Sequence, residues 1–165
     1  HVKWDIVRPT SIWGEFFEGG YSLFFKVIKK KMFFLPDVAP IIKPTCYVQN
    51  IVYMFDKLIN NDGHGRVFYA ADYPPSSVQT WAESISIHYH GRSKIFKMPY
   101  ACMKLAAVVG DLLSFVGLPS PLTSARLTNM LTSQEYPTDE LKKIVGPLPF
   151  SQSQAVRRTV AWSND

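Results

Sequence analysis

The sequence places few reactive side chains at spacings that could do chemistry. His88 and His90 stand two residues apart near the end of a predicted helix, which turns their rings away from each other. Surface histidines are therefore a better interpretation than a metal site, and we expect no metal site in the chain. Asp62 and His64 lie in a glycine turn without a serine or cysteine in a nucleophile context, so we expect a turn there.

Two further patterns concern nucleotides and catalysis. No loop of the form G-x-G-x-x-G or G-x-x-x-x-G-K-S/T follows a predicted strand, so the sequence carries no recognisable phosphate-binding loop. We also expect no Tyr-x-x-x-Lys pair in this chain and no other catalytic residue. If the protein handles a nucleotide, its phosphate-binding loop is expected to lie elsewhere.

The bulk composition is that of a single folded unit. The chain has 165 residues, of which 47% are apolar and 14% aromatic, and this is sufficient for a packed core. The net charge of +5 comes from basic residues spread along the chain, and their one dense run, residues 26–31, is typical of a solvated helix face. Nucleic acid is therefore not an expected partner. Two cysteines without Cys-x-x-Cys spacing indicate no disulfide framework and no zinc site, and favour a reducing, cytoplasmic setting.

The most apolar stretch is residues 100–119. Lys104 and Asp111 lie within it and would make a membrane span costly, so we expect no span. We predict instead a buried helix over 100–115, with an interfacial helix as the alternative. Its apolar side chains at helical spacing are Leu105, Val108, Val109, Leu112 and Leu113.

Hydrophobic spacing and turn residues predict alternating strands and helices along the chain. Strands are expected at 2–7, 66–71 and 94–99, with one or two short extended pieces in the proline-rich segment 32–46. Helices are expected at 19–31, 47–58, 100–115, 123–130 and 138–145, and after the capping-box pairs Ser76/Gln79 and Ser151/Gln154. This alternation favours an α/β fold over a helical bundle or a β-sandwich.

Four segments occur in an order that is more specific than any one of them alone. They are residues 4–15 (WDIVRPTSIWGE), 43–59 (KPTCYVQNIVYMFDKLI), 65–99 (beginning GRVFYAADYPP) and 139–162 (DELKKIVGPLPFSQSQAVRRTVAW). Together they resemble the carboxy-terminal half of the extended short-chain dehydrogenase/reductase family. This NAD-dependent epimerase/dehydratase group includes nucleotide-sugar epimerases and 3β-hydroxysteroid-dehydrogenase-like enzymes. The resemblance covers nearly the whole chain.

The resemblance implies a fold and a domain organisation. Residues 1–165 would form a single partial unit: the last strands of a Rossmann-type parallel sheet, at about 2–8 and 66–71, with a small, mainly helical substrate-binding lobe. The glycine-rich dinucleotide loop and the Tyr-x-x-x-Lys pair of the family would precede residue 1, and a compact stand-alone module is the alternative. With its strand at 2–7 paired only to residues 66–68 and nearby extended pieces, we expect the isolated chain to be marginally stable or self-associating, and to bind NAD poorly.

The resemblance also assigns roles around the first predicted strand. Pro9 and Thr10 would face the nicotinamide of NAD or NADP at the carboxyl end of that strand, and Ser11 would touch the substrate. Gly14 would close the same substrate-binding loop, for which simple turn chemistry is the alternative.

Three further residues of the resemblance concern the substrate. Lys43 and Arg126 stand where many nucleotide-sugar enzymes carry arginines, Arg126 at the position that meets the diphosphate, and Tyr47 belongs to the same substrate-binding motif. Lys43 would be a less directional clamp than arginine. For a nucleotide-sugar enzyme we expect Lys43 and Arg126 to point into one cleft near residues 9–14, although solvated cations are the alternative. Asn50 replaces the aspartate common in that motif, and this form is closer to the steroid-dehydrogenase-like and O-antigen sugar branches.

The function implied by the resemblance concerns a parent protein. That parent would be an NAD(P)-dependent nucleotide-sugar epimerase or dehydratase, in some cases a homodimer, that moves a hydride between a substrate hydroxyl carbon and the nicotinamide. This chain would supply the substrate-binding half, with a small-molecule partner such as a nucleoside diphosphate sugar, and would be inactive alone. A 3β-hydroxysteroid-dehydrogenase-like oxidoreductase and a non-catalytic Rossmann-like regulator remain as alternatives.

Overall fold

The computed structural model describes residues 2–17, 19–61, 63, 65–93, 95–120 and 122–164. Its strands are β1 (Ile6–Pro9), β2 (Ser11–Trp13), β3 (Phe34–Pro36), β4 (Thr45–Tyr47), β5 (Val67–Ala70) and β6 (Phe96–Met98). Its helices are α1 (Gly20–Lys29), α2 (Val48–Ile59), α3 (Val78–His90), α4 (Tyr100–Phe115), α5 (Ser124–Leu131), α6 (Asp139–Val145) and α7 (Gln152–Trp162). The predicted α/β alternation is confirmed, with helix bounds close to those expected.

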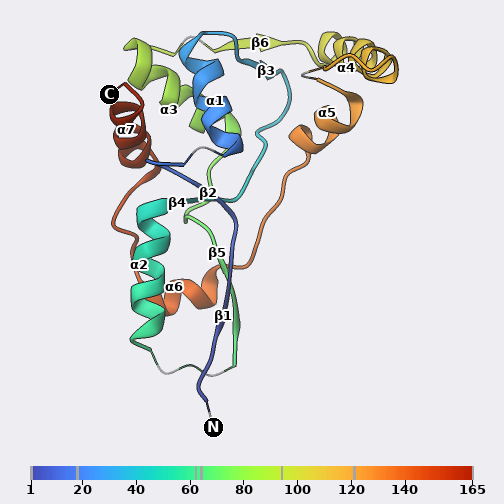
Figure 1. Cartoon of the computed structure of the whole chain (residues 1–165). Coiled ribbons are helices and arrows are strands. Elements are labelled where there is room, and N and C mark those ends of the chain that lie inside the picture. The colour runs from blue at the N-terminus through green and yellow to red at the C-terminus, as the bar shows by residue number, and fades with distance from the viewer. Residues whose placement is uncertain are drawn as a thin grey trace.

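The described strands form three parallel pairs, β1 with β5, β2 with β4 and β3 with β6 (Figure 1). The predicted pairing of the first strand is confirmed, since Ile6 lies opposite Val67 and Val7 opposite Phe68. The strand begins later than expected, at Ile6, and just before it the Asp5 side chain accepts the backbone N–H of Arg66 at 3.0 Å. Ile6 and Val67 are more than two-fifths exposed, so this strand pair is not buried on both of its faces.

Two serines cap helices in the body of the molecule. Ser151 forms the predicted capping box with Gln154, and both of its hydrogen bonds are present. At α3 the prediction of Ser76 is wrong: Ser77 is the N-cap, and its hydroxyl accepts the Thr80 N–H at 3.0 Å. Ser76 accepts instead from the side chain of Gln152, across the molecule.

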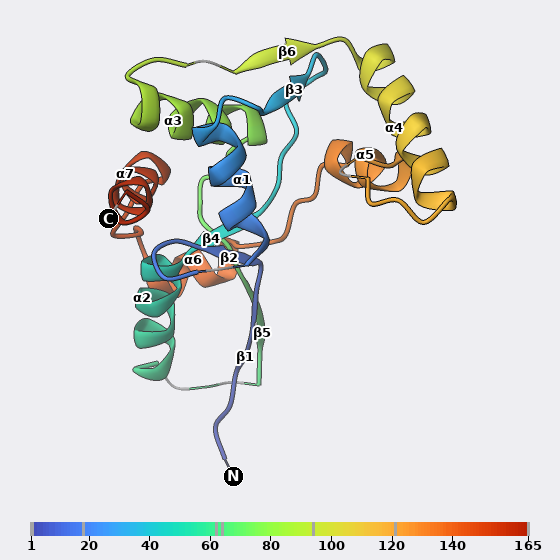
Figure 2. The same ribbon diagram turned by 45° about the horizontal axis from the view of Figure 1, so that its top comes forward.

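The body has two hydrophobic clusters, one on each side of the β2–β4 pair. The upper cluster packs α1, α3 and α7 around Trp13, whose ring centroid lies 4.9 Å from that of Trp81 and 5.4 Å from that of Tyr47. The lower cluster packs α2 and α6 against β5 through Met54, Phe68 and Leu141. Figure 2 shows these two groups of helices above and below the middle strands.

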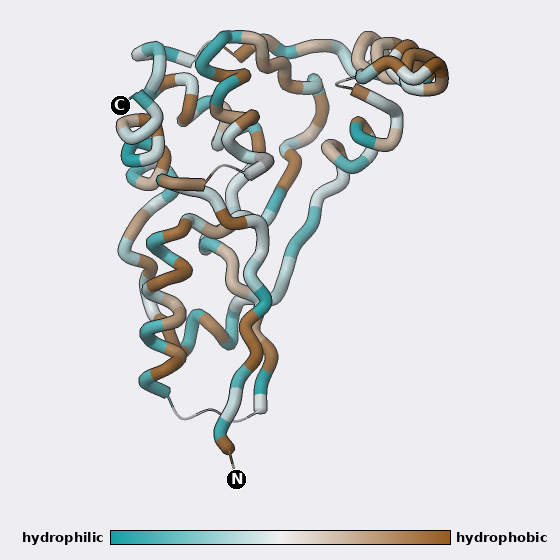
Figure 3. The backbone as a smooth tube through the Cα atoms, in the orientation of Figure 1, coloured by the Kyte–Doolittle hydropathy of each residue, from teal (hydrophilic) through white to brown (hydrophobic). Residues whose placement is uncertain are grey.

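Helices α4 and α5 form an appendage, residues 100–131, beyond β6, which we call the α4–α5 hairpin (Figures 1 and 2). Its small core consists of Met103, Ala107 and Leu127. Gly110 lies so close to the neighbouring loop that a Cβ there would meet the Leu122 carbonyl oxygen at 1.7 Å. Here the sequence prediction fails, because the apolar stripe expected to be buried in α4 is exposed. Figure 3 shows hydrophobic residues along the trace of this helix. No helix in the described part of the chain is both long and apolar enough to cross a membrane.

Candidate functional site

The carboxyl ends of β1 and β5 meet where the chain passes from the first strand pair to the second. Thr10 is the single residue between β1 and β2, and both its backbone N–H and its Oγ1 donate to the Ala70 carbonyl, at 2.9 and 3.1 Å. In open parallel sheets ligands bind outside the carboxyl ends of the strands. This edge is therefore the candidate functional site.

Pro9 and Thr10 can be tested against the nicotinamide role that the resemblance assigns to them. Pro9 is exposed and has no N–H group, while the two donors of Thr10 are both engaged by Ala70. Pro9 and Thr10 could pack against the nicotinamide ring, but neither has a free hydrogen-bond donor for the carboxamide group of that ring. The described residues at this edge therefore do not by themselves form a dinucleotide site. Ser11 is exposed on β2, opposite Thr45.

Lys43 lies beside this edge, just before β4. Its Nζ donates to the Asn129 carbonyl of α5 at 2.8 Å, and it lines a cavity of about 200 Å³ together with Asp72 and Ser151. Partial burial lowers the pKa of Lys43. The neighbouring Ile42 bonds residues 133 and 134, donating its N–H to the Ser133 hydroxyl and accepting the Gln134 N–H, both at 3.0 Å.

Arg126 lies in the first turn of α5, and its guanidinium points the other way along the hairpin. Its Nη1 donates to the Ser120 carbonyl at 2.7 Å, and it lines a different cavity with Ser114, Pro119 and Thr123. The structure therefore does not bring Lys43 and Arg126 into the single cleft expected near residues 9–14. The physical reason is that the Ser120 carbonyl, in the loop between α4 and α5, accepts a hydrogen bond from the Arg126 guanidinium.

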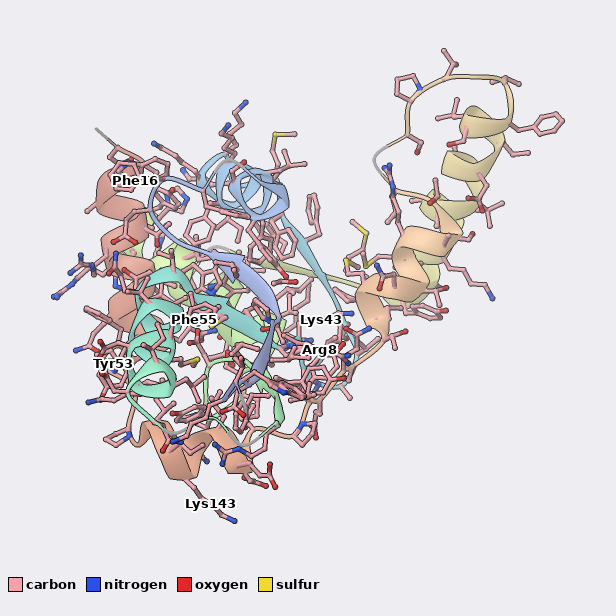
Figure 4. The ribbon with its side chains drawn as sticks, turned by 60° about the horizontal axis from the view of Figure 1, so that its bottom comes forward. Arg8, Phe16, Lys43, Tyr53, Phe55 and Lys143 are labelled. Carbon is pink, nitrogen blue, oxygen red and sulfur yellow. The ribbon has the colours of Figure 1, made fainter. Side chains whose placement is uncertain are left out.

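Sequence reasoning missed a second cation at this edge, Arg8. Its guanidinium lies 6.0 Å from the Tyr69 ring centroid, and Tyr69 stacks on Tyr136 with 4.7 Å between centroids and 18° between planes. Because residues 133 and 134 bond Ile42 while Tyr136 stacks beside Arg8, one extended segment passes both cations. Figure 4 labels Arg8 and Lys43 next to each other beside β1. Tyr136 lies 67 residues after Tyr69 in the sequence, so no local sequence pattern predicts this cluster.

Tyr47 is completely buried and cannot touch a ligand in this conformation. Its hydroxyl lies 2.8 Å from both oxygens of Glu15, and Arg158 Nε donates to Glu15 Oε1 at 3.0 Å. Burial raises the pKa of Tyr47, and the hydrogen bond to Glu15 raises it further. The structure thus gives Tyr47 a positioning role: it ties the loop after β2 to α7. Glu15 and Arg158, which sequence analysis missed, complete this network.

Gly14 is fixed by packing as well as by its turn. Its φ of +141° lies in the region that favours glycine, and a Cβ would come within 2.5 Å of Val48 Cγ1. The glycine lets β2 run directly against the first turn of α2. It also lines a cavity of about 670 Å³ between α1 and α7.

Asp72 and Asn50 form a buried polar pair where β5 meets α2. Asp72 accepts the Tyr47 N–H and the Asn50 side-chain amide, both at 2.8 Å, and Asn50 exchanges hydrogen bonds with the backbone of Phe150. Burial raises the pKa of Asp72 to about 6, against the opposing effect of these hydrogen bonds. An aspartate at position 50 would place a second negative charge against the Asp72 carboxylate, whereas the observed asparagine donates a hydrogen bond to it.

The expectation that the chain has no Tyr-x-x-x-Lys spacing is wrong, because two pairs have it: Tyr100 with Lys104, and Tyr53 with Lys57. The first pair lies on α4, beyond the body of the molecule. The second pair lies on α2, where Lys57 Nζ is 5.2 Å from the centroid of the Tyr53 ring. Figure 4 places Tyr53 away from Arg8 and Lys43. A lysine over the ring is a helix-surface contact at i, i+4 spacing, which does not assign the pair a catalytic role.

The two histidine features have simple outcomes. His88 Nδ1 lies 2.8 Å from the Ser84 carbonyl and His90 Nε2 lies 3.3 Å from the Ile28 carbonyl, so the two rings meet different segments, as predicted. The predicted turn at Asp62 and His64 falls on residues outside those that the structure describes.

Solved structures resemble this chain over nearly its full length. The structure of gox2253 has a TM-score of 0.70 at 14% sequence identity, covering 97% of this chain and 48% of that one. The human epimerase family protein SDR39U1 with NADPH has a TM-score of 0.66 at 10% identity, covering 96% and 48%. UDP-N-acetylglucosamine 4-epimerase from Bacillus cereus has 0.66 at 8% identity, covering 98% and 48%.

The chain has the fold of the carboxy-terminal part of an extended short-chain dehydrogenase/reductase. It spans about half the length of the structures it matches, and identities of 8–14% establish the fold alone. No family model matches the sequence. No curated protein sequence matches it either.

Proposed function

We propose that this chain is the substrate-binding part of an NAD(P)-dependent epimerase or related oxidoreductase. The observation that carries the proposal is the fold: a match over 96–98% of the chain to structures that include two epimerases, one of them crystallised with NADPH. The order of the four sequence segments supports the same conclusion independently. In this proposal the dinucleotide loop and the catalytic residues belong to a part of the protein outside this chain.

The finer proposal is a nucleoside diphosphate sugar as substrate. Lys43 would meet a phosphate, since it stands at the strand edge, is partly buried, and carries a positive charge that can donate a charge-assisted hydrogen bond. Arg8 would add a second positive charge there, and the exposed hydroxyl of Ser11 would contact the sugar. Arg126 would take this role only after leaving the Ser120 carbonyl. Tyr47 and Gly14 would hold the site in shape, and Pro9 and Thr10 would border the nicotinamide.

The second candidate is a 3β-hydroxysteroid-dehydrogenase-like oxidoreductase. Two observations favour it: Lys43 and Arg126 line different cavities, and asparagine stands at position 50. A neutral polycyclic substrate would need neither cation.

Ligand-observed NMR with the purified chain separates the two candidates. We expect saturation transfer to UDP-N-acetylglucosamine and none to a 3β-hydroxysteroid. Lys43→Met should weaken nucleotide-sugar binding about tenfold, because a hydrogen bond to a charged group is worth about 1.5–3 kcal/mol. Lys57→Met, on the distant α2 surface, is the matched control and should change nothing. Transfer to the steroid alone would favour the second candidate, and transfer to neither by a folded chain would contradict both.

A further inference from the structure

Helix α4 has two faces with opposite surroundings. Met103, Ala107 and Gly110, spaced four and three residues apart, are buried against α5 and its preceding loop. The opposite face carries apolar side chains that are between 39% and 90% exposed: Leu105, Val108, Val109, Leu112, Leu113, Phe115 and Val116. At 100° per residue these positions form one continuous arc around the helix.

The exposed arc contains no charged side chain. Lys104 and Asp111, the two charges of α4, lie seven residues apart at the border between the exposed and the packed face. Over its 16 residues the helix is about 24 Å long, and the half-exposed Leu118 extends the apolar surface beyond its end. The free and exposed Cys102 also lies on this arc.

The surroundings of the arc combine apolar and basic side chains. Figures 1 and 2 show α4 at the same end of the molecule as β6, β3 and the carboxyl end of α1. Three large apolar residues of this end are exposed, namely Met32 (63%), Phe34 (42%) and Phe96 (60%). The exposed cations among them are Lys30, Lys31 and Lys97. This end therefore presents hydrocarbon together with positive charge.

We propose that the α4 arc binds the surface of an anionic phospholipid membrane, with the helix lying in the interface and its α5-facing side turned away. The arc itself carries only apolar side chains and Cys102, and its charged neighbours Lys104 and Asp111 lie along one border only. Such a surface suits hydrocarbon better than a protein partner, whose interface would carry about one hydrogen bond per 100–200 Å². The lysines complement anionic headgroups. A spanning orientation does not fit, because α5 already covers one side of the helix.

Cys102 provides a label at the site itself. Cys46 is completely buried, so an environment-sensitive fluorophore attached to the native chain under folded conditions reacts at Cys102. We expect its emission to shift to the blue when vesicles of phosphatidylcholine with one-third phosphatidylserine are added, and lipid-borne quenchers to reduce it. Sedimentation of the unlabelled chain with the same vesicles gives a second readout that the label cannot perturb.

Matched variants test which residues are responsible. Leu105→Glu with Leu112→Glu, at positions 68% and 64% exposed, should lower the partition coefficient by about tenfold for each leucine. Ile59→Glu, at an equally exposed position on α2, is the control and should bind as the unaltered chain does. Lys30→Glu with Lys31→Glu should weaken binding to anionic vesicles roughly fivefold per lysine. Circular dichroism establishes that each variant is folded.

Each remaining outcome counts against the proposal. A blue shift that needs no lipid and grows with protein concentration would mean that a second copy covers the arc. Equal loss of binding in the Ile59→Glu control would mean non-specific adsorption. No sedimentation of the folded chain with these vesicles would leave the arc without a lipid partner.

Discussion

The body of the molecule and the α4–α5 hairpin are built from similarly apolar sequence, yet they bury it very differently. In the body, Trp13, Met54 and Ile85 have at most 1% of their surface exposed. In the hairpin, Leu105 and Leu112 are more than 60% exposed, and the buried cluster has three members. The difference teaches that apolar residues at helical spacing identify the apolar face of a helix. The spacing does not predict which other element, if any, packs against that face. In the body, α1, α3 and α7 cover one side of the β2–β4 pair while α2 and α6 cover the other, and in the hairpin α5 covers only one side of α4.

The largest expected effect separates the two regions by substitution. Trp13→Ala should lower the free energy of unfolding by about 3–5 kcal/mol, because it leaves a cavity among Phe25, Tyr47 and Trp81. Leu112→Ala, at a position 64% exposed, should change it by less than about 0.5 kcal/mol. Urea denaturation followed by far-ultraviolet circular dichroism measures both. Equal losses would mean that the hairpin shares the body's core.

The next effect concerns charge inside the body. The pKa of Asp72 is raised from 3.8 to about 6, so the folded state holds this proton more tightly than the unfolded state. The contribution of Asp72 to stability is therefore greatest below about pH 4 and decreases as the pH rises through about 6. Relative to Asp72→Asn, the unaltered chain should lose about 2–3 kcal/mol over this interval.

The control for this titration is Glu83→Gln on the exposed surface of α3. Its free energy of unfolding should follow the unaltered chain at every pH. A difference between the unaltered chain and Asp72→Asn that stays constant from pH 4 to pH 7 would contradict the assignment.

The smallest effect compares a helix cap from each region. Ser151→Ala removes the capping box of α7 and should destabilise the whole body by about 1 kcal/mol. Thr123→Ala removes the cap of α5, whose hydroxyl accepts the Arg126 N–H at 3.3 Å, and should affect the hairpin alone. Amide hydrogen exchange resolves the two, since faster exchange should spread over the body in the first variant and stay within residues 100–131 in the second. Faster exchange across the whole chain in both would show one cooperative unit.

The fold was predictable from sequence to the extent that its signals are local. Apolar spacing and turn residues predict α1, α2 and α7 within about two residues, and the Ser151–Gln154 pair is correct because a capping box involves neighbours only. Ser76 and Ser77 are adjacent, and the choice between them depends on Gln152 from another helix. Local pattern cannot supply that partner.

The candidate site was less predictable, because its contacts join distant parts of the chain. The first strand ends at Pro9, close to the end that the resemblance implied, whereas the roles assigned to Lys43 and the other site residues stay predictions. The Glu15–Arg158 bond joins residues 143 apart, and the direction of Arg126 depends on the carbonyl of Ser120 in the preceding loop. Neither has a signature in residue type or spacing, so the Arg8–Tyr69–Tyr136 cluster and the Glu15 network emerge only from the structure.

The aromatic packing around Trp13 has an optical consequence. Trp13 and Trp81 lie 4.9 Å apart with their planes inclined at 56°, a geometry in which the indole transitions couple and give a paired band of opposite signs in ultraviolet circular dichroism. All four tryptophans of the sequence, Trp4, Trp13, Trp81 and Trp162, lie outside residues 100–131. The chain therefore carries a built-in chromophore pair in the body, while the hairpin contains no indole and is invisible to excitation at the red edge of tryptophan absorption.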